Sequence, residues 1–287
     1  MKQVNRICAE DFDDLHYSMT HNMARDLYAV DQQRQLISGA RLSDLDMMEK
    51  SLDMLADVVV NAHRIEVDPD HVPSTEGLAR KPPFPLVALS HSVQVENNDA
   101  TKGALTQCID IVLGEIDEPD CVMVIPFFRN ILQKHWMPGM YTATYNAVDE
   151  TKDIAIELFW GFEQNGNMST HVFRQPALST LGFVRDTFAL INCSNVSLQR
   201  NEPSNLRKMR ARKKGIELNA YHTIKLPGSA RSQREHQGGT HASPAMHHRR
   251  GHYRTLYGGT EKQRDVYVNP CVVGSIENGR VAHDYEV

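Results

Sequence analysis

The cysteines of this sequence are few and widely spaced, and none belongs to a C-x-x-C pair. The 287-residue chain has five, an odd number, at Cys8, Cys108, Cys121, Cys193 and Cys271. Disulfide-stabilised domains and cysteine zinc sites need closely spaced or evenly paired cysteines. The spacing therefore excludes both classes and is typical of a protein with reduced thiols.

Long apolar runs and glycine-rich phosphate loops are also missing. The first eleven residues already contain acidic side chains, and no later stretch approaches the 18 apolar residues of a membrane span. No glycine-rich loop follows a candidate strand, which disfavours a nucleotide-binding enzyme. We expect a soluble, cytoplasmic protein without a membrane partner and without a cofactor.

The charges are distributed unevenly. Residues 200–270 contain 15 Lys or Arg and 5 Asp or Glu, about +10, whereas the rest of the chain contains 16 and 31, about −15. A basic segment of this density favours a polyanionic partner such as nucleic acid. Docking of the basic segment on the acidic remainder would give the same pattern, so both interpretations stay open.

Hydrophobic periodicity predicts both helices and strands. Apolar residues at three- and four-residue steps predict helices over 10–37, 43–62 and 177–198, and a short basic helix over 206–214 with Ser204 as its cap. Alternating β-branched and aromatic residues predict strands over 86–95, 105–113, 121–127, 140–147, 153–162, 221–226 and 280–287, and a hairpin of 252–256 with 265–273. The proline-rich segment 68–85 is expected to be a connector, and 227–244 a surface loop.

These elements predict an α+β fold. It consists of an N-terminal helical hairpin with a mixed or antiparallel sheet, and a small basic C-terminal β module. The expected boundaries are 1–199 for the mixed domain, 200–219 for a basic connector and 220–287 for the C-terminal module. The basic charge thus falls on the last two of these three segments.

The densest chemistry lies in Ala245–Arg254, where three arginines, three histidines and a tyrosine occur within ten residues. Guanidinium groups bind phosphates through two hydrogen bonds, and tyrosine rings stack on unpaired bases. The predicted nucleic-acid-binding residues are Arg207, Lys208, Arg210, Arg212, Lys213, Lys214, Arg249, Arg250, His252, Tyr253, Arg254 and Tyr257.

Three other hypotheses use the same stretch. His247, His248 and His252 with Arg250 have the chemistry of a metal-independent ribonuclease, in which histidines transfer the protons and arginine stabilises the phosphorane. The spacing of His241, His247, His248 and His252 matches no zinc pattern, so no metal is expected. In the third hypothesis the basic hairpin serves only folding or assembly, since basic edge strands also hinder aggregation.

The C-terminal part of the chain resembles a family of phage and mobile-element proteins. The similar residues are His248-Arg-Arg-Gly-His-Tyr253, Tyr257 before glycine, and Asp265-Val-Tyr-Val-Asn-Pro270. Further similar segments, Leu190–Val196, Arg207–Gly215 and Ala220–Ile224, extend the resemblance over residues 180 to 273. The family includes the type V-A anti-CRISPR proteins that suppress production of the CRISPR effector nuclease.

The resemblance implies a phage-encoded counter-defence or host-takeover protein that acts by binding, in the cytoplasm of an infected or lysogenic bacterium. Its implied partners are RNA or a ribonucleoprotein and a nascent or folded host defence protein, chosen by the N-terminal half. This is our leading hypothesis from the sequence. A ribonuclease and a structural phage protein are the alternatives.

Overall fold

The computed structural model describes residues 10–21, 23, 42–73, 80–95, 104–116, 119–130, 136–139, 141–149, 154–158, 171–213, 219–227, 245–249, 251–273 and 275–280. The chain divides into two compact units. The first comprises residues 1–191 and 198–224, and the second comprises residues 192–197 and 225–287. Each unit is therefore built from two separate stretches of sequence.

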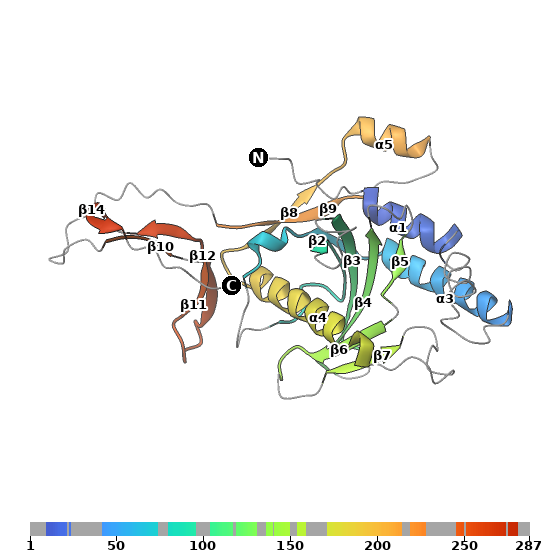
Figure 1. The fold of residues 1–287 in the computed structure, drawn as a ribbon, viewed down its shortest axis with the longest axis horizontal. Coiled ribbons are helices and arrows are strands. Elements are labelled where there is room, and N and C mark those ends of the chain that lie inside the picture. The colour runs from blue at the N-terminus through green and yellow to red at the C-terminus, as the bar shows by residue number, and fades with distance from the viewer. Residues whose placement is uncertain are drawn as a thin grey trace. The chain divides into compact units, whose positions relative to one another are not determined.

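A nine-stranded mixed sheet forms the frame of the first unit (Figure 1). Its strands are β1 (His63–Glu66), β2 (Leu86–Val95), β3 (Ala104–Gly114), β4 (Cys121–Asn130), β5 (Met137–Pro138), β6 (Tyr141–Asn146), β7 (Ala155–Leu158), β8 (Ser197–Asn201) and β9 (Tyr221–Lys225). Their order is β7-β6-β4-β3-β2-β1-β9-β8, with β5 paired to β4. The β1 strand pairs in parallel with β2 and β9, whereas the pairs from β2 to β7 are antiparallel.

Helices cover both faces of this sheet. Successive strand residues point to opposite faces, so the apolar run Leu86–Leu89 at the start of β2 contributes side chains to the cores on both faces of the sheet. On one face, α1 (Glu10–His21) and α3 (Leu42–Val60) pack with Ala88 and Ile111 in one core. On the other, α4 (His171–Ile191) packs with Val87 and Leu89 in a second core.

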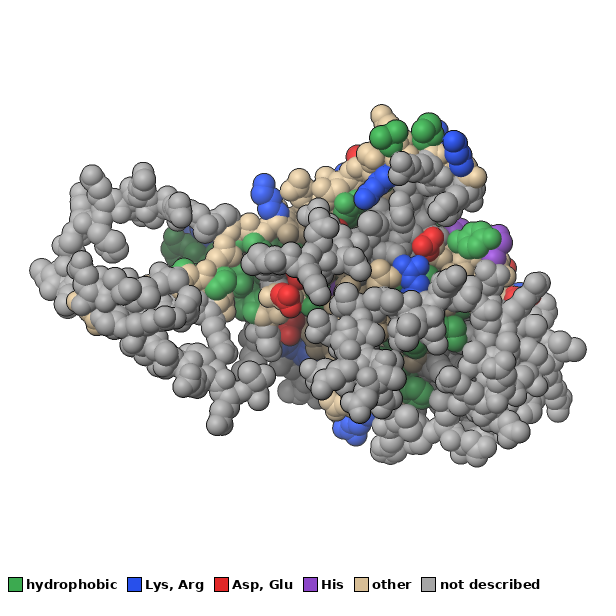
Figure 2. All heavy atoms as spheres, turned by 45° about the horizontal axis from the view of Figure 1, so that its top comes forward, with side chains coloured by type: hydrophobic (Ala, Val, Ile, Leu, Met, Phe, Trp, Pro, Cys, Tyr) green, Lys and Arg blue, Asp and Glu red, His purple; other side chains and the backbone are tan. Residues whose placement is uncertain are grey.

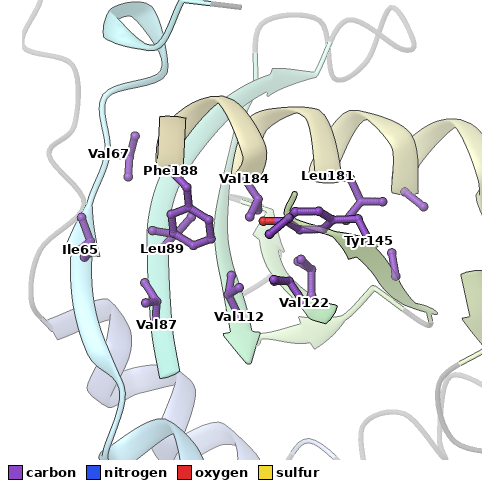
Figure 3. Packing of buried hydrophobic residues seen from close by; sticks show 14 of the residues in the cluster. Ile65, Val67, Val87, Leu89, Val112, Val122, Tyr145, Leu181, Val184 and Phe188 are labelled. Atoms are coloured by element: carbon purple, nitrogen blue, oxygen red, sulfur yellow. The ribbon is translucent and has the colours of Figure 1, made fainter. Parts of the chain in front are cut away.

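Figure 3 shows how α4 closes the second core. Leu181, Val184 and Phe188 recur at helical spacing and point down onto the sheet, where they meet Val87, Leu89 and Val112. All six side chains are buried. The apolar stripe of α4 thus fixes the helix across the sheet.

The second unit contains only short strands among its described residues. They are β10 (Ala245–Arg249), β11 (His252–Leu256), β12 (Arg264–Val268), β13 (Cys271–Val273) and β14 (Ser275–Arg280). The β10 strand lies between β13 and β14, and β11 pairs only with β12 in a separate two-stranded sheet. This is the C-terminal β module.

The observed elements confirm the predicted α+β class and correct several boundaries. The predicted strands over 86–95, 105–113, 121–127, 140–147 and 221–226 are present, as is the hairpin that starts at His252. The helix predicted over 177–198 ends at Ile191 and is followed by β8, and β1 has no counterpart in the prediction. The expected extension of the first helix to residue 37, the loop 228–244 and the strand 281–287 lie outside the described residues.

The two units also differ in their boundaries from the segments 1–199, 200–219 and 220–287. The strands β8 and β9 are neighbours in the large sheet, so the basic segment between them belongs to the first unit. Residues 192–197 belong to the second unit, where two of them bind β12. None of the described helices is long and apolar enough to cross a membrane.

Candidate nucleic-acid interface

The β11–β12 hairpin holds four of the predicted nucleic-acid-binding residues: His252, Tyr253, Arg254 and Tyr257. The two strands pair antiparallel from His252 opposite Val268 to Leu256 opposite Arg264. Residues opposite each other in such a pair share one face of the sheet. The register therefore fixes which of these side chains can act together.

The outer edge of β12 is closed by the turn at Ser194 and Asn195. The Ser194 amide donates to Asp265 O at 2.9 Å, and the Asn195 side chain exchanges two hydrogen bonds with the backbone of Tyr267. Because these backbone groups point away from β11, Asp265 and Tyr267 occupy the non-hydrogen-bonded positions of the hairpin. Side chains come closest across such positions.

One face of the hairpin accordingly carries two close cross-strand pairs. Tyr253 packs against Tyr267 with ring centroids 5.5 Å apart, and the Thr255 hydroxyl donates to the Asp265 carboxylate at 2.6 Å. Tyr267 is 5% exposed and Tyr253 is half-buried. Tyr253, predicted as a stacking surface for bases, thus forms part of the packing of the hairpin.

His252 and Arg254 lie on the opposite face, because strand residues alternate. Arg254 is exposed and stands opposite Val266, and the exposed Arg264 stands opposite Leu256 on the same face. Sequence reasoning omitted Arg264. The register of the hairpin identifies Arg264, because the residue opposite Leu256 lies on the same face as Arg254.

The tip of the hairpin presents the ring of Tyr257. This residue adopts a left-handed backbone conformation with φ 55° and is 60% exposed. Its carbonyl accepts hydrogen bonds from the amide and the hydroxyl of Thr260 at 3.1 and 2.7 Å, and Gly259, with φ 75°, donates to Gln263 Oε1 at 2.9 Å. These bonds hold the turn in one shape.

A cation lies beside this exposed ring. The Arg264 guanidinium lies 5.9 Å from the ring centroid of Tyr257, within cation–π range. Lys262, in the same turn, is also exposed. The tip therefore combines a flat aromatic face with positive charge, the two components of a platform for an unpaired base and its phosphate.

The remaining residues of the basic cluster are placed only in part. His247, His248 and Arg249 lie on β10, paired in register with Val273, Val272 and Cys271, but their side chains are outside the described part of the structure. Arg250 is outside it altogether. The convergence of His247, His248, His252 and Arg250 that a ribonuclease requires therefore stays a prediction.

The second basic segment forms α5 (Asn205–Arg212). Ser204 caps it as predicted, with its hydroxyl accepting from Arg207 N at 3.4 Å. Lys208 donates to Glu202 at 3.3 Å, and Arg200 pairs with the same carboxylate at 2.9 Å. The side chain of Arg210, and Lys214 as a whole, are outside the described residues.

Three of the basic side chains near α5 are exposed: Arg207, Arg212 and Lys213. They belong to the first compact unit, whereas the hairpin belongs to the second. The two predicted groups of nucleic-acid-binding residues are therefore on different bodies.

The first unit also contains a buried histidine that belongs to neither basic group. His91 Nε2 and Asp110 Oδ2 are 2.9 Å apart in the large sheet, with side chains 7% and 2% exposed. The ring of Phe183 from α4 covers the imidazole, with centroids 4.0 Å apart. This pair had no signal in the sequence, and its burial closes it to a substrate, so we assign it to the core.

Within the described residues, no group of three or more His, Cys, Asp or Glu side chains is arranged to hold a metal ion. Comparison of the chain with protein-family models, curated proteins and solved structures finds no match. The hairpin and α5 are therefore the two candidate binding sites.

Proposed function

We propose that the protein acts by binding and that its β11–β12 hairpin binds single-stranded RNA, free or within a ribonucleoprotein. The observation that carries this proposal is the tip of the hairpin. There an exposed Tyr257 ring with a left-handed backbone lies beside the guanidinium of Arg264.

The backbone of Tyr257 supports a functional role for its ring. Bulky residues rarely adopt positive φ, and Asn or Gly would occupy this position at lower energetic cost. Strain of this kind persists where the surrounding structure imposes it, often at binding sites. Because Tyr257 is 60% exposed, packing in the fold does not explain why an aromatic residue occupies the turn.

The charges favour RNA over a neutral ligand, and the shape favours unpaired nucleotides. Arg254, Lys262 and Arg264 are exposed on the hairpin and outnumber its exposed acid, Glu261, while Asp265 accepts a hydrogen bond from Thr255. A base can stack on Tyr257 only when it is unstacked from its own helix. Single strands, loops and bulges meet this condition, whereas a regular duplex does not.

In the cell, we propose that this binding serves counter-defence or host takeover by a phage. The support is the resemblance of residues 180 to 273 to the family that suppresses production of a CRISPR effector. RNA or a ribonucleoprotein would then be the ligand of the hairpin in the bacterial cytoplasm. A nascent or folded host defence protein would be the partner of the first unit.

The test is an anisotropy titration of a fluorescent, unstructured RNA with wild-type protein and with Tyr257→Asn. Asparagine tolerates positive φ, so the variant keeps the turn and removes the ring. Stacking contributes about 1–3 kcal/mol per base, so affinity should fall between about fivefold and about a hundredfold. Thermal stability should stay equal or rise.

Two controls separate stacking from charge. Arg254→Ala should lower affinity and reduce the salt slope by about one counterion, whereas Arg174→Ala, an exposed arginine on α4, should change neither. Unchanged RNA affinity of both hairpin variants would refute the proposal. Cleavage of the RNA in EDTA, lost in His252→Ala, would replace binding with the ribonuclease alternative.

A further inference from the structure

The α5 helix presents apolar side chains to water. Leu206 is 65% exposed and Met209 is 52% exposed, and neither belongs to the two described hydrophobic cores. In Figure 2, hydrophobic and basic side chains lie next to one another on this helix, at the top of the view. An eight-residue helix gains little from propensity alone, so contacts with a partner would stabilise it.

Three side chains of α5 form a strip together with Lys213, which follows the last helical residue and whose amide donates to Met209 O at 3.3 Å. At about 100° per residue, Arg212, Met209, Lys213 and Leu206 project within about a third of a turn, and the exposed, uncharged Asn205 lies between Arg212 and Met209. Cations and apolar groups alternate in this strip, which we call the α5 strip. The sequence from 205 to 213 contains no acidic residue.

The exposed side of α3 has the complementary composition. Asp53 and Asp57 are one turn apart and both exposed, and Met54 and Val60 flank them at 72% and 44% exposure. The exposed Lys50 lies on the same side, one turn before Met54, so two carboxylates face outward there beside one cation. The opposite side of α3 is buried through Leu52, Ala56 and Val59. The strip of Val60, Asp53, Asp57 and Met54, the α3 strip, also spans about a third of a turn.

We propose that the α5 strip of one copy of the chain docks on the α3 strip of a second copy. Two carboxylates between two apolar side chains would face two cations interleaved with two apolar side chains. Opposite charges and apolar surfaces would then be paired in one contact. The opposite charges of the two strips are the reason for choosing a second copy of the chain as the partner of α5.

Both strips belong to the same compact unit, yet each is exposed in the single chain. They therefore do not cover each other within one molecule. Between two molecules, the contact can form twice about a two-fold axis, with α5 of each copy on α3 of the other. Two equal contacts give a closed dimer and double the buried area.

The apolar residues favour a protein partner over RNA for α5. The cations of α5 would suffice to bind phosphates, and contact with the RNA backbone would leave Leu206 and Met209 without an apolar surface to bury them. A helix face that carries both apolar and acidic side chains can contact the apolar residues and the cations of α5 together. The RNA site proposed above is on the other unit and does not require this contact.

Sedimentation velocity of the full chain over a dilution series tests the dimer. We expect concentration-dependent association that weakens with added salt, because the charges are exposed. The double reversal Arg212→Glu with Lys213→Glu should raise the dimer dissociation constant at least about tenfold, since repulsion replaces attraction in both symmetric contacts. Asp53→Lys with Asp57→Lys should do the same.

Combining the four reversals in one chain should restore association, because the charges are then complementary again. Glu157→Lys with Arg174→Glu, exposed charges on β7 and α4, is the matched control and should leave association unchanged. The proposal would be overturned by a protein that is monomeric at all concentrations, or by a dimer whose dissociation constant is the same in the wild type and in both charge-reversal variants. So would loss of RNA affinity with unchanged sedimentation in the α5 variant, which would make α5 an RNA-binding helix.

Discussion

The side-chain amide of Asn195 binds the backbone of Tyr267 as a neighbouring strand would. Asn195 Nδ2 donates to Tyr267 O at 2.7 Å, and Tyr267 N donates to Asn195 Oδ1 at 2.9 Å. The two residues are 72 positions apart in the sequence. This pair, together with the bonds from Ser194 to Asp265 O, attaches residues 192–197 to β12 and closes the edge of the hairpin.

Replacing Asn195 with alanine should therefore destabilise the second unit. Both backbone groups of Tyr267 would lose their partners, at a cost of about 1–3 kcal/mol. Faster hydrogen exchange at the Tyr267 amide, measured by NMR, would report this loss. Asn195→Asp should also destabilise, because its carboxylate cannot donate to the Tyr267 carbonyl. Unchanged exchange in both variants would contradict the strand-like role, and Asn201→Ala, a change in the first unit, serves as control.

The side chain of Tyr267 leaves no room for a larger residue than glycine at position 251. A Cβ atom at position 251 would stand 2.3 Å from the Tyr267 hydroxyl oxygen and 3.0 Å from its ring carbon Cζ. Gly251→Ala should thus cost about 1–3 kcal/mol through overpacking. Hydrogen exchange of β11 and β12 amides would measure the cost.

The double variant Gly251→Ala with Tyr267→Phe is the discriminating experiment. Removing the hydroxyl relieves the closest contact, so the alanine should cost less in the Tyr267→Phe background than in the wild type. Equal costs in the two backgrounds would show that Gly251 is needed for a different reason. Gly258→Ala is the matched control, since the nearest atom to its added Cβ is 4.0 Å away.

The elements that the sequence predicts well are those whose signal is local. The β2 strand matches its predicted bounds of 86–95. A short run rich in valine and leucine, preceded by prolines, indicates a buried strand without reference to the rest of the chain. Ser204 was recognisable as a helix cap from the residues beside it. The β11–β12 hairpin followed from alternation around a glycine-containing turn.

The elements that the sequence misses depend on distant partners. The helical spacing of Leu181, Val184 and Phe188 predicted a helix up to residue 198, whereas α4 ends at Ile191. The chain leaves the helix where Ser194 and Asn195 bind β12, about 70 residues further on. The β8 strand is polar and short, and only its place beside β9 in the sheet identifies it.

The candidate site shows the same division. Composition located the cationic stretch and the aromatic Tyr257, but it could not separate Tyr253, which packs on Tyr267, from Tyr257, which is exposed. It also omitted Arg264, whose position opposite Leu256 depends on the register. Residue types suggest a class of ligand, whereas the pairing of strands determines which of those residues can meet it.

The buried hydroxyl of Tyr141 predicts a loss of stability at high pH. Burial raises the pKa of Tyr141 from 10.0 to about 12, and the Asp110 carboxylate acts in the same direction, while the hydrogen bond with Thr180 lowers it. Below the unfolded value of 10.0 both states are protonated and the stabilisation is complete. As the pH rises from 10.0 to about 12, the unfolded state ionises first and the stabilisation is lost.

Urea unfolding of wild type and Tyr141→Phe between about pH 8 and about pH 11 checks this dependence. Tryptophan fluorescence reports on the first unit alone, because both tryptophans of the chain precede Asn192. At about pH 8 the variant should be less stable by about 1 kcal/mol, through loss of the bond with Thr180. The difference should shrink as the pH rises above 10.0, because phenylalanine has no proton to lose. A constant difference would show that Tyr141 does not contribute to the alkaline transition, and Tyr17→Phe, an exposed tyrosine on α1, should follow the wild-type curve.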